Sequence, residues 1–372
     1  MKIAVTGAKG LLGWHTSARI HAENCAAAYK GKSRPYELVQ IDRQTFMDDR
    51  LLPQSLKDVD AVIHFAGINR GNEAEVERAN PDIAERLVEG CKAANINPHI
   101  VYANSTHANN DTFYGRSKKR AGQTLAAFAE NYTDIVLPHI FGECARPYYN
   151  NVTATLIDKL WKNEEPDINP AGQVQLLHAG QAANMAIAAV VHRQNGTQTP
   201  SGRIIKISEL YEKLRGFHDL YCDNIFPVLN DPFDLALFNS YRTAAFPDHY
   251  PKKLQVNRDH RGMLFESAKG GSDGTQSFLS STLPGKTRGD HFHLELVERF
   301  LVVHGSAIIR IRKVLTSEVH EFHVSGDEPA AIDMIPLHTH HIVNISDEPV
   351  ITYFWAHHMF DPSAPDTYAD SV

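Results

Sequence analysis

The stretch MKIAVTGAKGLLG, from Met1 to Gly13, decides the fold of the first part of the chain. Its apolar run ends at Gly7, and Gly10 and Gly13 follow at intervals of three residues. Glycines in this pattern allow a tight turn and let the backbone approach a pyrophosphate, whose charge then lies at a helix N-terminus. The stretch therefore predicts a strand, a phosphate-binding loop and a helix, as in dinucleotide-binding α/β domains.

Downstream of this loop, apolar strand-like runs alternate with segments of helical periodicity. The runs YELVQIDR, DAVIHFAG and HIVYANS are apolar over most of their length, which suits strands buried on both faces of a parallel sheet. Helices are predicted between them, at 11–28, at 73–94 and from about Tyr114 onward. This alternation predicts a Rossmann-type α/β domain.

The pattern loosens after about residue 146, where helices are predicted at 151–163, 180–193 and 207–218. Their connections are polar and rich in Pro, Gly and Asn, which suits a substrate-binding lobe. The stretch FPDHYPKKL, around residue 250, carries two prolines and no strong helix or strand signal. The chain is therefore predicted to divide into residues 1–248 and residues 249–372.

The last third of the chain has a different texture. Short β-rich runs such as ERFLVVHGSAIIRIRKV and PVITYFWAHH are separated by turns, and helical periodicity is missing. Many short strands at regular spacing predict an all-β sandwich or barrel. Of the 21 histidines, 11 lie after residue 250, which indicates that this part carries chemistry of its own.

Composition excludes several classes of partner. The formal net charge is −7 and there is no run of basic residues, so neither nucleic acid nor an anionic membrane surface is expected as a partner. No apolar stretch is long enough to cross a bilayer, and the N-terminus passes into a strand-like run without a signal peptide. The 4 cysteines are scattered, which suits free thiols and a cytoplasmic location.

Two residues at the end of the second predicted strand bear on the choice of nucleotide. Asp42 and Arg43 lie where the adenosine ribose of a dinucleotide would lie. An aspartate there binds the ribose hydroxyls of NAD, whereas an arginine can bind the 2′-phosphate of NADP. The pair predicts NADPH as the cofactor, with NADH as the alternative.

The segment YGRSK places Tyr114 and Lys118 four residues apart, on one face of a helix. An ammonium close to a phenol favours the phenolate, so the pKa of Tyr114 is expected to fall toward neutrality. Such a tyrosine can protonate a carbonyl oxygen while a hydride arrives at the carbon. Ser105 or Thr106, which follow the preceding strand, can hydrogen-bond the same carbonyl, and Ser105 is preferred. An ordinary surface helix is the alternative reading of the spacing.

In their order along the chain, these motifs resemble the extended short-chain dehydrogenase/reductase family over residues 1–245. The resemblance implies nicotinamide chemistry on a sugar nucleotide, with catalytic roles for Ser105, Tyr114 and Lys118. The stretch LLHAGQAAN lacks an acidic pair that the family often has there. The implied cofactor-binding residues are Gly7, Gly10, Leu11, Leu12, Gly13, Asp42, Arg43, Ala66, Gly67, Asn80, Tyr114, Lys118 and Pro138.

The stretch GKTRGDHFHLELVERFLVVHG, from Gly285 to Gly305, carries a second motif. Its spacing, G-x5-H-x-H-x4-E-x6-G, matches the first motif of the cupin family, which implies a jelly-roll barrel. His291 and His293 share one face of a strand, and Glu298 returns on the next strand. Two imidazoles and one carboxylate suit Zn²⁺ or another divalent transition metal.

The second cupin motif offers His341, five residues after Pro336, as the fourth metal ligand. It departs from the family pattern, because His338 replaces the usual glycine and Asn344 comes one position early. Other histidines in this part of the chain are expected in exposed turns: His338, His340, His357 and His358.

The flanks of the first motif resemble the sugar-nucleotide 3,5-epimerase branch of the cupins, the relatives of dTDP-4-dehydrorhamnose epimerase. In that branch an Arg-Gly pair precedes a histidine base, and Arg288, Gly289 and His291 match this pattern. A keto group acidifies the neighbouring C–H bond, so a base and an opposing acid can invert that carbon. His291 thus has two competing roles, metal ligand and proton acceptor.

Over nearly all 372 positions the chain resembles the CapF-type bifunctional enzymes of capsular polysaccharide synthesis, in which a short-chain reductase is fused to a cupin. RPYYNNVTATL, TLPGKTRGDHFH and FDPSAPDT carry this resemblance. It implies C3 epimerisation of a UDP-4-keto-6-deoxy-N-acetylhexosamine, then NADPH-dependent C4 reduction to UDP-N-acetyl-6-deoxytalosamine, on the route to N-acetylfucosamine. It also implies bound zinc and a homodimer formed through the cupin.

Two other functions stay open at this point. One is a 4-keto sugar-nucleotide reductase whose cupin serves only dimerisation or binding. The other is a sugar-nucleotide-binding regulatory protein without catalysis, against which the intact set of Ser105, Tyr114 and Lys118 argues.

Overall fold

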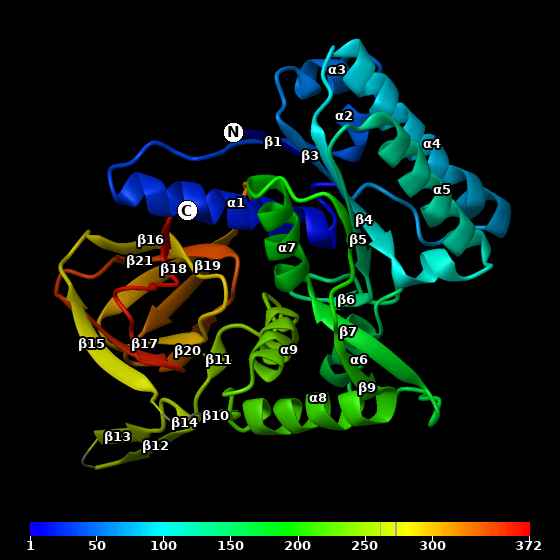
Figure 1. Cartoon of the computed structure of the whole chain (residues 1–372). Helices are drawn as coiled ribbons and strands as arrows, with labels where there is room; N and C mark the ends of the chain where they lie inside the picture. Colours follow the sequence, from blue (N-terminus) through cyan, green and yellow to red (C-terminus); the bar gives the residue numbers. More distant parts are fainter. Residues whose placement is uncertain (261, 272–273) are drawn as a thin grey trace. The chain divides into compact units, whose positions relative to one another are not determined.

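The computed structural model describes residues 1–260, 262–271 and 274–372 (Figure 1). The chain divides into two compact units. The first comprises residues 1–153 and 171–206, and the second comprises residues 154–170 and 207–372.

The first unit is built on a six-stranded sheet with the order β2-β1-β3-β4-β5-β8, in which every neighbouring pair is parallel. Alternate residues of β1 face different cores, because Ala4 packs in one cluster and Ile3 and Val5 in the other. Burial on both faces explains the continuous apolar runs, and the predicted Rossmann-type sheet is confirmed. The strands are β1 Lys2–Thr6, β2 Glu37–Ile41, β3 Ala61–His64, β4 His99–Ser105, β5 Tyr132–Leu137 and β8 Gly196–Gln198.

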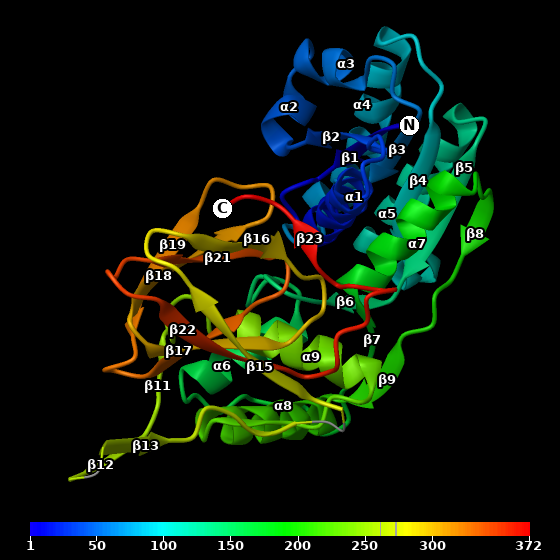
Figure 2. The same ribbon diagram turned by 90° about the vertical axis from the view of Figure 1, so that its left-hand side faces the viewer.

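Helices cover both faces of this sheet (Figure 2). On one face, α1 (Leu11–Tyr29) and α7 (Ala179–Val191) bury residues such as Ile20 and Ala186. On the other, α4 (Glu73–Ala93) and α5 (Phe113–Phe128) bury residues such as Leu87 and Leu125. The remaining elements are α2 Arg43–Met47, α3 Leu51–Leu56, the 3₁₀ helix η1 Thr106–Asn109, and a small sheet of β6 His139–Phe141, β7 Gln173–His178 and β9 Arg203–Lys206.

The second unit contains two five-stranded sheets, with the orders β11-β20-β17-β22-β15 and β19-β18-β21-β16-β23. Phe300 from the first sheet shares one buried cluster with Ile309 and Ile342 from the second, so the sheets pack face to face. The predicted all-β character of the last third is confirmed. The strands are β11 Lys252–Lys253, β15 Gln276–Thr282, β16 Thr287–Phe292, β17 Glu298–His304, β18 Ser306–Lys313, β19 Val319–Ser325, β20 Ala330–Met334, β21 His338–Asn344, β22 Val350–Ala356 and β23 Tyr368–Ala369.

Helices also pack within the second unit. They are α8 Ile207–Cys222, α9 Pro232–Thr243 and most of α6 Val152–Trp161. Two short pairings complete the unit, β10 Ile225–Phe226 with β14 Lys269–Gly270 and β12 Val256–Asp259 with β13 Gly262–Phe265.

Buried polar contacts fasten α8 and α9 to the strands. Arg242 of α9 is fully buried and donates to two backbone carbonyls of the all-β part. Tyr221 of α8 donates to Asp333, 2.5 Å away, and Asp333 forms a buried ion pair with Arg299. The two compact units therefore do not meet at residues 248/249. The predicted domain boundary at that position stays a prediction.

Candidate functional site

The glycine loop joins β1 to α1, as the sequence predicts. Gly7 has a φ of +66°, and the Gly10 N–H donates to the Gly7 carbonyl at 2.9 Å, which closes the turn. A Cβ on Gly13 would lie 2.2 Å from the Gly7 carbonyl oxygen, so only glycine lets the helix come this close. The N–H groups of the first turn of α1, which includes Leu11 and Leu12, have no helical partner and suit a phosphate.

Asp42 and Arg43 lie at the start of α2 rather than within β2. Asp42 caps the helix by accepting the Thr45 N–H at 2.9 Å, and it forms an ion pair with Lys9 at 2.7 Å. The hydrogen bond from Lys9, followed by that from Thr45, lowers the pKa of Asp42 to about 2. Asp42 is thus ionised, and Arg43 is exposed beside it. The contact of either residue with a cofactor ribose stays a prediction. The choice of NADPH over NADH stays a prediction.

The loop after β3 is braced by Asn80 of α4. Asn80 is buried, accepts the Ile68 N–H at 2.9 Å and donates to the Ile68 carbonyl at 2.8 Å. A Cβ on Gly67 would lie 2.9 Å from the Asn80 Oδ1, and the Ala66 N–H donates to Thr6. Asn80 therefore shapes the Ala66-Gly67 loop, whereas direct contacts of these residues with a cofactor stay predictions. Pro138, predicted beside the nicotinamide, is buried directly after β5.

Ser105 ends β4, and Tyr114 lies in the first turn of α5. Burial raises the pKa of Tyr114, and a hydrogen bond with Ser105 offsets part of this rise. Thr106 is exposed, so the structure brings Ser105 to the phenol. The predicted fall of the Tyr114 pKa toward neutrality is wrong for this structure, because burial disfavours the phenolate.

The side chain of Lys118 does not supply the expected charge to Tyr114. Its ammonium donates to the Ala103 carbonyl at 2.6 Å and lies 4.1 Å from the centre of the Tyr102 ring. Burial lowers the pKa of Lys118 to about 7, against an opposing effect of Asp134. Near neutral pH the group therefore carries only part of a positive charge.

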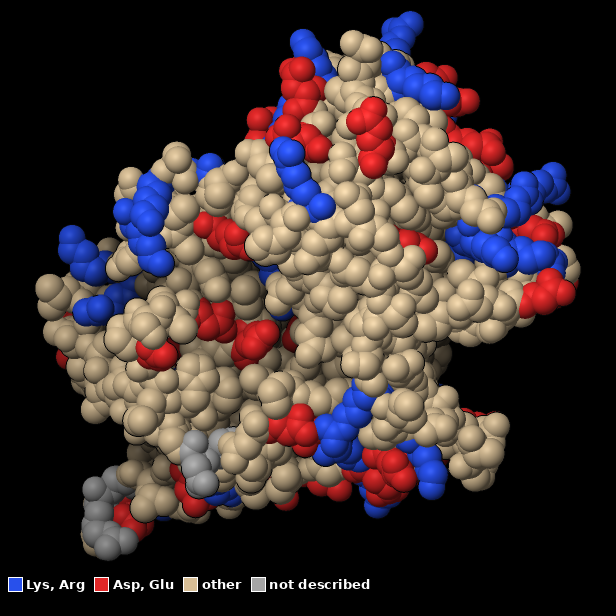
Figure 3. Space-filling model, in the orientation of Figure 1, with Lys and Arg blue, Asp and Glu red and all other residues tan. Residues whose placement is uncertain are grey.

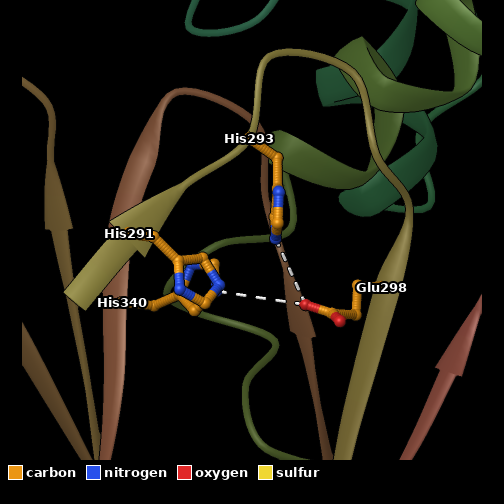
Figure 4. Close-up of side chains that lie close together, drawn as sticks. All are labelled: His291, His293, Glu298 and His340. Atoms are coloured by element: carbon orange, nitrogen blue, oxygen red, sulfur yellow. Dashed lines mark hydrogen bonds and ion pairs between the residues drawn. The ribbon is translucent and has the colours of Figure 1, made fainter. Parts of the chain in front are cut away.

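Four side chains of the second unit lie close together, as Figure 4 shows: His291, His293, Glu298 and His340. One ligand atom of each lies within 4.8 Å of the others. His291 on β16 faces His340 on β21, where the two residues are paired. His293 directly follows β16, and its Nε2 lies 3.3 Å from the carboxylate of Glu298, which begins β17.

Backbone carbonyls orient the three imidazole rings of this group. His293 Nδ1–H donates to the Asp366 carbonyl, and His340 Nδ1–H donates to the His338 carbonyl at 3.2 Å. His291 is hydrogen-bonded to the backbone of Gly289. The Nε2 of His340 is buried, has no hydrogen-bond partner among the described residues, and lies 4.0 Å from Glu298. An unpartnered ring nitrogen beside a carboxylate, with its other nitrogen fixed by a carbonyl, fits a metal ligand.

Burial also determines the protonation of the group. It lowers the pKa of His291 to about 4, and it lowers the pKa of His340 well below the usual value. Burial acts in the same direction on His293, but the hydrogen bond to Glu298 leaves the pKa of His293 raised. His291 and His340 are therefore neutral at physiological pH, which is the form that binds a metal.

The structure places His340, not His341, with the other three residues. His341 is instead bound to Asp290, with 2.9 Å between Nδ1 and Oδ1. The predicted exposed turns are wrong for His338, His340 and His357, which are buried, while His358 is exposed as predicted. Alternation along β21 carried the missed signal, because His340 lies two residues from the core residue Ile342 and so shares its face.

A second buried group, in the first unit, was not foreseen from the sequence: His15, Glu143 and His178. The carboxylate of Glu143 lies 2.8 Å from His178 Nε2 and 3.7 Å from His15 Nε2. Burial lowers the pKa of His15 to about 3, and the nearby Arg19 lowers it further. Because Arg19 already contributes positive charge here, we interpret the group as a set of structural hydrogen bonds rather than as a cation site.

Charged residues on the outside are mixed. On the face drawn in Figure 3, lysines and arginines stand among aspartates and glutamates, and the described residues form no continuous basic area there. The described helices also include none with the length and apolar character that a membrane crossing requires.

The chain belongs to the NAD dependent epimerase/dehydratase family, which matches residues 3–207. Residues 257–368 match a second family, the polysaccharide biosynthesis C-terminal domain. The first match covers the parallel sheet and the glycine loop, so a nicotinamide cofactor belongs to this unit.

Relatives agree with this assignment along the whole chain. A UDP-2-acetamido-2,6-beta-L-arabino-hexul-4-ose reductase of Pseudomonas aeruginosa is 28% identical over 381 residues, covering 100% of this chain and 99% of the relative. The capsular polysaccharide assembling protein CapF of Staphylococcus aureus is 28% identical, with full coverage of both chains and a TM-score of 0.58. A second crystal form of CapF gives 26% identity, full coverage of both chains and a TM-score of 0.52. The chain is a CapF-type protein.

Proposed function

We propose that this protein epimerises C3 of a UDP-4-keto-6-deoxy-N-acetylhexosamine and then reduces C4 with NADPH, giving UDP-N-acetyl-6-deoxytalosamine. The observation that carries the proposal is that one chain holds two sets of reactive groups. Ser105 and Tyr114 lie in the first unit, and the group of His291, His293, Glu298 and His340 lies in the second. The Pseudomonas relative, named as a reductase of a UDP-linked 4-ketosugar, supports the substrate class.

The reduction uses Tyr114 as a proton donor. When bound, the nicotinamide cofactor supplies the hydride that C4 receives. Tyr114 then donates its phenolic proton to the C4 oxygen, and the Ser105 hydroxyl helps to orient that oxygen. The raised pKa of Tyr114 suits this direction, because the phenol is protonated when the ketone arrives. Lys118 holds the end of β4 through the Ala103 carbonyl, on the strand that carries Ser105.

For the epimerisation, we assign the all-β domain to the cupin fold and its four-residue group to Zn²⁺ or another divalent transition metal. Three imidazoles and one carboxylate are a common donor set for such ions, and the unpartnered His340 Nε2 supports the assignment. When bound, the metal supplies an electrophilic centre. The 4-keto group acidifies the C3–H bond. A base takes that proton and exchanges it with solvent, and an acid returns a solvent-derived proton to the opposite face, which inverts C3.

His291 is assigned to the metal group rather than to the role of free base. Its ring centre lies 4.7 Å from that of His340 and 5.1 Å from that of His293. A pKa of about 4 makes an uncoordinated His291 a weak proton acceptor at neutral pH. Either role makes His291 necessary for inversion at C3.

We also propose a homodimer formed through the all-β domain. β15 lies at the edge of its sheet, where only β22 pairs with it among the described strands. Phe278 and Leu279 of this strand are 42% and 65% exposed, and an apolar edge of this kind suits pairing with a second copy. Sedimentation analysis of Leu279→Lys against the wild type tests this arrangement.

Solvent deuterium tests the two-step function. The wild-type protein should incorporate deuterium at C3 of the 4-ketosugar without NADPH, and should make reduced product once NADPH is added. His291→Ala should stop the exchange but still reduce a sugar that is already epimerised. Tyr114→Phe should keep the exchange and lose reduction by at least about a hundredfold, the usual scale of a general acid. Tyr29→Phe, at a residue 84% exposed, is the matched control.

A second candidate is a 4-ketosugar reductase whose all-β domain serves only dimerisation or binding. The name of the Pseudomonas relative favours this candidate, because that name mentions reduction alone. Reduction without any C3 exchange in the wild type would select this candidate and reject the epimerase step.

A further inference from the structure

The C-terminal segment returns to the proposed metal group through one residue, Asp366. Its carboxylate accepts the backbone N–H groups of three consecutive residues, Leu294 at 2.8 Å, Glu295 at 2.7 Å and Leu296 at 2.8 Å. These residues form the turn between β16 and β17. His293 immediately precedes the turn, so the carboxylate fastens the piece of backbone that presents a proposed ligand.

The backbone of Asp366 contacts the ligand itself. The His293 Nδ1–H donates to the Asp366 carbonyl, and the Thr367 hydroxyl lies 3.5 Å from the same nitrogen. Because the Asp366 carbonyl holds Nδ1, the other ring nitrogen, Nε2, is directed toward Glu298, 3.3 Å away. One residue thus fixes both the position of the turn and the orientation of the ring.

We propose that Asp366 is a positioning residue for the metal group, which it preorganises by holding His293 with Nε2 directed toward Glu298. The inference rests on the proposed metal site. A ligand held by a partner on its other ring nitrogen binds metal more tightly, because less ordering remains to be done when the ion arrives. The metal affinity of the all-β domain therefore depends on a residue far along the chain from His291 and His293.

Other contacts hold the C-terminal segment in place when Asp366 is changed. β23 pairs with β16, and the two lie side by side in Figure 2. Asp370 binds the Arg312 guanidinium at 2.8 Å and accepts the Thr339 hydroxyl at 2.7 Å. A substitution at Asp366 is therefore expected to loosen the turn and His293 while the segment stays attached to its sheet.

Zinc transfer to a chromophoric chelator measures the proposed effect on the full-length protein. Asp366→Asn keeps the size but replaces one acceptor oxygen with an N–H donor, and Asp366→Ala removes the carboxylate. Both should weaken zinc binding by about 10- to 100-fold, the usual cost of losing a group that orients a ligand. Asp361→Asn is the matched control, because Asp361 is exposed in the same segment and, among the described residues, its side chain accepts from Ser363, two residues away.

Two further readouts do not depend on activity. With Co²⁺ in place of zinc, the visible absorption spectrum should change in the Asp366 variants and stay unchanged in Asp361→Asn. If the turn held by Asp366 favours zinc binding, zinc binding must in return stabilise the turn. Zinc should therefore slow hydrogen exchange at the amides of 294–296 in the wild type, and should slow it less in Asp366→Asn. Circular dichroism checks the fold, and Asp366→Asn decides the question if Asp366→Ala does not fold.

The possible results distinguish a failure of the role of Asp366 from a failure of the proposed metal site. Zinc loss in the Asp366 variants alone supports the positioning role. Equal zinc affinity, Co²⁺ spectrum and exchange in the wild type and Asp366→Asn overturn it, while the metal site stands. A wild-type protein that binds no zinc overturns the metal site, and the role of Asp366 falls with it.

Discussion

Adjacent histidines of β21 have different surroundings. His340 faces His291 and Glu298, whereas His341 lies on the other side of the strand and binds Asp290. We therefore expect His340→Ala to lower zinc content per chain and zinc affinity markedly, because a proposed ligand is lost. His341→Ala should leave both close to the wild-type values. Elemental analysis after purification without chelators, followed by competition with a chelator, measures this difference.

The pair of variants controls for the general effect of removing an imidazole from β21. If His341→Ala loses zinc and His340→Ala keeps it, the fourth ligand is His341, the residue that the family motif indicates. Because side chains alternate along a strand, a shift of one residue exchanges the two faces. The strand β16 carries a register shift between Gly289 and His291, so its pairing with β21 does not follow from the sequence motif.

Arg43 tests the choice of nicotinamide cofactor. It is exposed at the start of α2, next to Asp42, whose carboxylate is occupied by Lys9 and Thr45. If Arg43 binds a 2′-phosphate, Arg43→Ala should weaken NADPH binding by about tenfold or more and leave NADH binding nearly unchanged. Fluorescence titration with both cofactors measures the ratio, and the exposed Arg34 provides a control as Arg34→Ala. Equal losses for the two cofactors, or a wild-type preference for NADH, would contradict the assignment.

The pKa of Tyr114 could not be predicted from the sequence motif. The YxxxK spacing correctly places both side chains on α5. It does not reveal that Lys118 reaches the Ala103 carbonyl or that burial raises the pKa of the phenol. Both facts depend on how deeply β4 and α5 bury these groups, which is a tertiary property.

Gly13 shows how closely α1 packs against the glycine loop. A Cβ there would lie 2.2 Å from the Gly7 carbonyl oxygen and 2.8 Å from the Ala8 Cα. Backbone atoms cannot yield easily, so Gly13→Ala should displace α1 or the loop. We expect cofactor binding to weaken by at least about tenfold and the free energy of unfolding to fall by roughly 1–3 kcal/mol.

Gly216 in α8 is the matched control. A Cβ there meets no heavy atom within 4 Å, and the residue lies in a regular helix. Gly216→Ala should raise the free energy of unfolding by about 0.5–1 kcal/mol, the usual gain from replacing a helical glycine. Urea unfolding of both variants, with and without NADPH, gives the comparison. Equal behaviour of the two would show that the close packing at Gly13 is not needed.

Elements with strong periodicity were predicted well, and short or polar ones were not. β1, β3 and β4 follow apolar runs, and the long helices follow segments with helical periodicity. The helices α2, α3 and α9 were missed. α9 nevertheless begins with a clear start signal, an Asp231 cap followed by Pro232. The attachment of α9 depends on Arg242, whose charge would suggest a surface position. Its burial is explained by its hydrogen bonds to the Asn239 side chain and to the carbonyls of Met334 and Leu296.

Buried neutral histidines should make the free energy of unfolding sensitive to acid. Burial lowers the pKa of His15 and of His64 to about 3. Below about pH 6.5 the unfolded chain binds these protons and the folded chain does not, so their stabilising contribution is complete above that pH and is lost as the pH falls toward 3. We expect the free energy of unfolding to fall by up to about 1.4 kcal/mol per pH unit for each such histidine.

Denaturant unfolding between pH 7 and pH 4.5 measures this slope. His64→Gln should flatten the slope by about one histidine's contribution, because the side chain no longer titrates. His192→Gln, at an exposed position, should leave it unchanged. An unchanged slope in His64→Gln would show that His64 does not stay neutral in the folded protein.

The two proposed half-reactions should be able to take place on different chains, since each compact unit carries its own set of reactive groups. A 4-ketosugar can exchange its C3 proton without a hydride, and an epimerised ketone can be reduced without the four-residue group. His291→Ala and Tyr114→Phe should therefore each keep one half-reaction. Because the intermediate can diffuse from one chain to another, a mixture of the two variants should form the reduced product that neither forms alone.

Chromatography of the products, with an excess of NADPH, measures this complementation. The rate in the mixture should rise with the concentration of the slower variant, as expected for a free intermediate. A mixture that forms no product, although each variant keeps its half-reaction, would mean that the intermediate passes only within one chain. If His291→Ala exchanges the C3 proton like the wild type, the all-β domain is not the epimerase, and the reductase whose second domain only binds or dimerises becomes the better account.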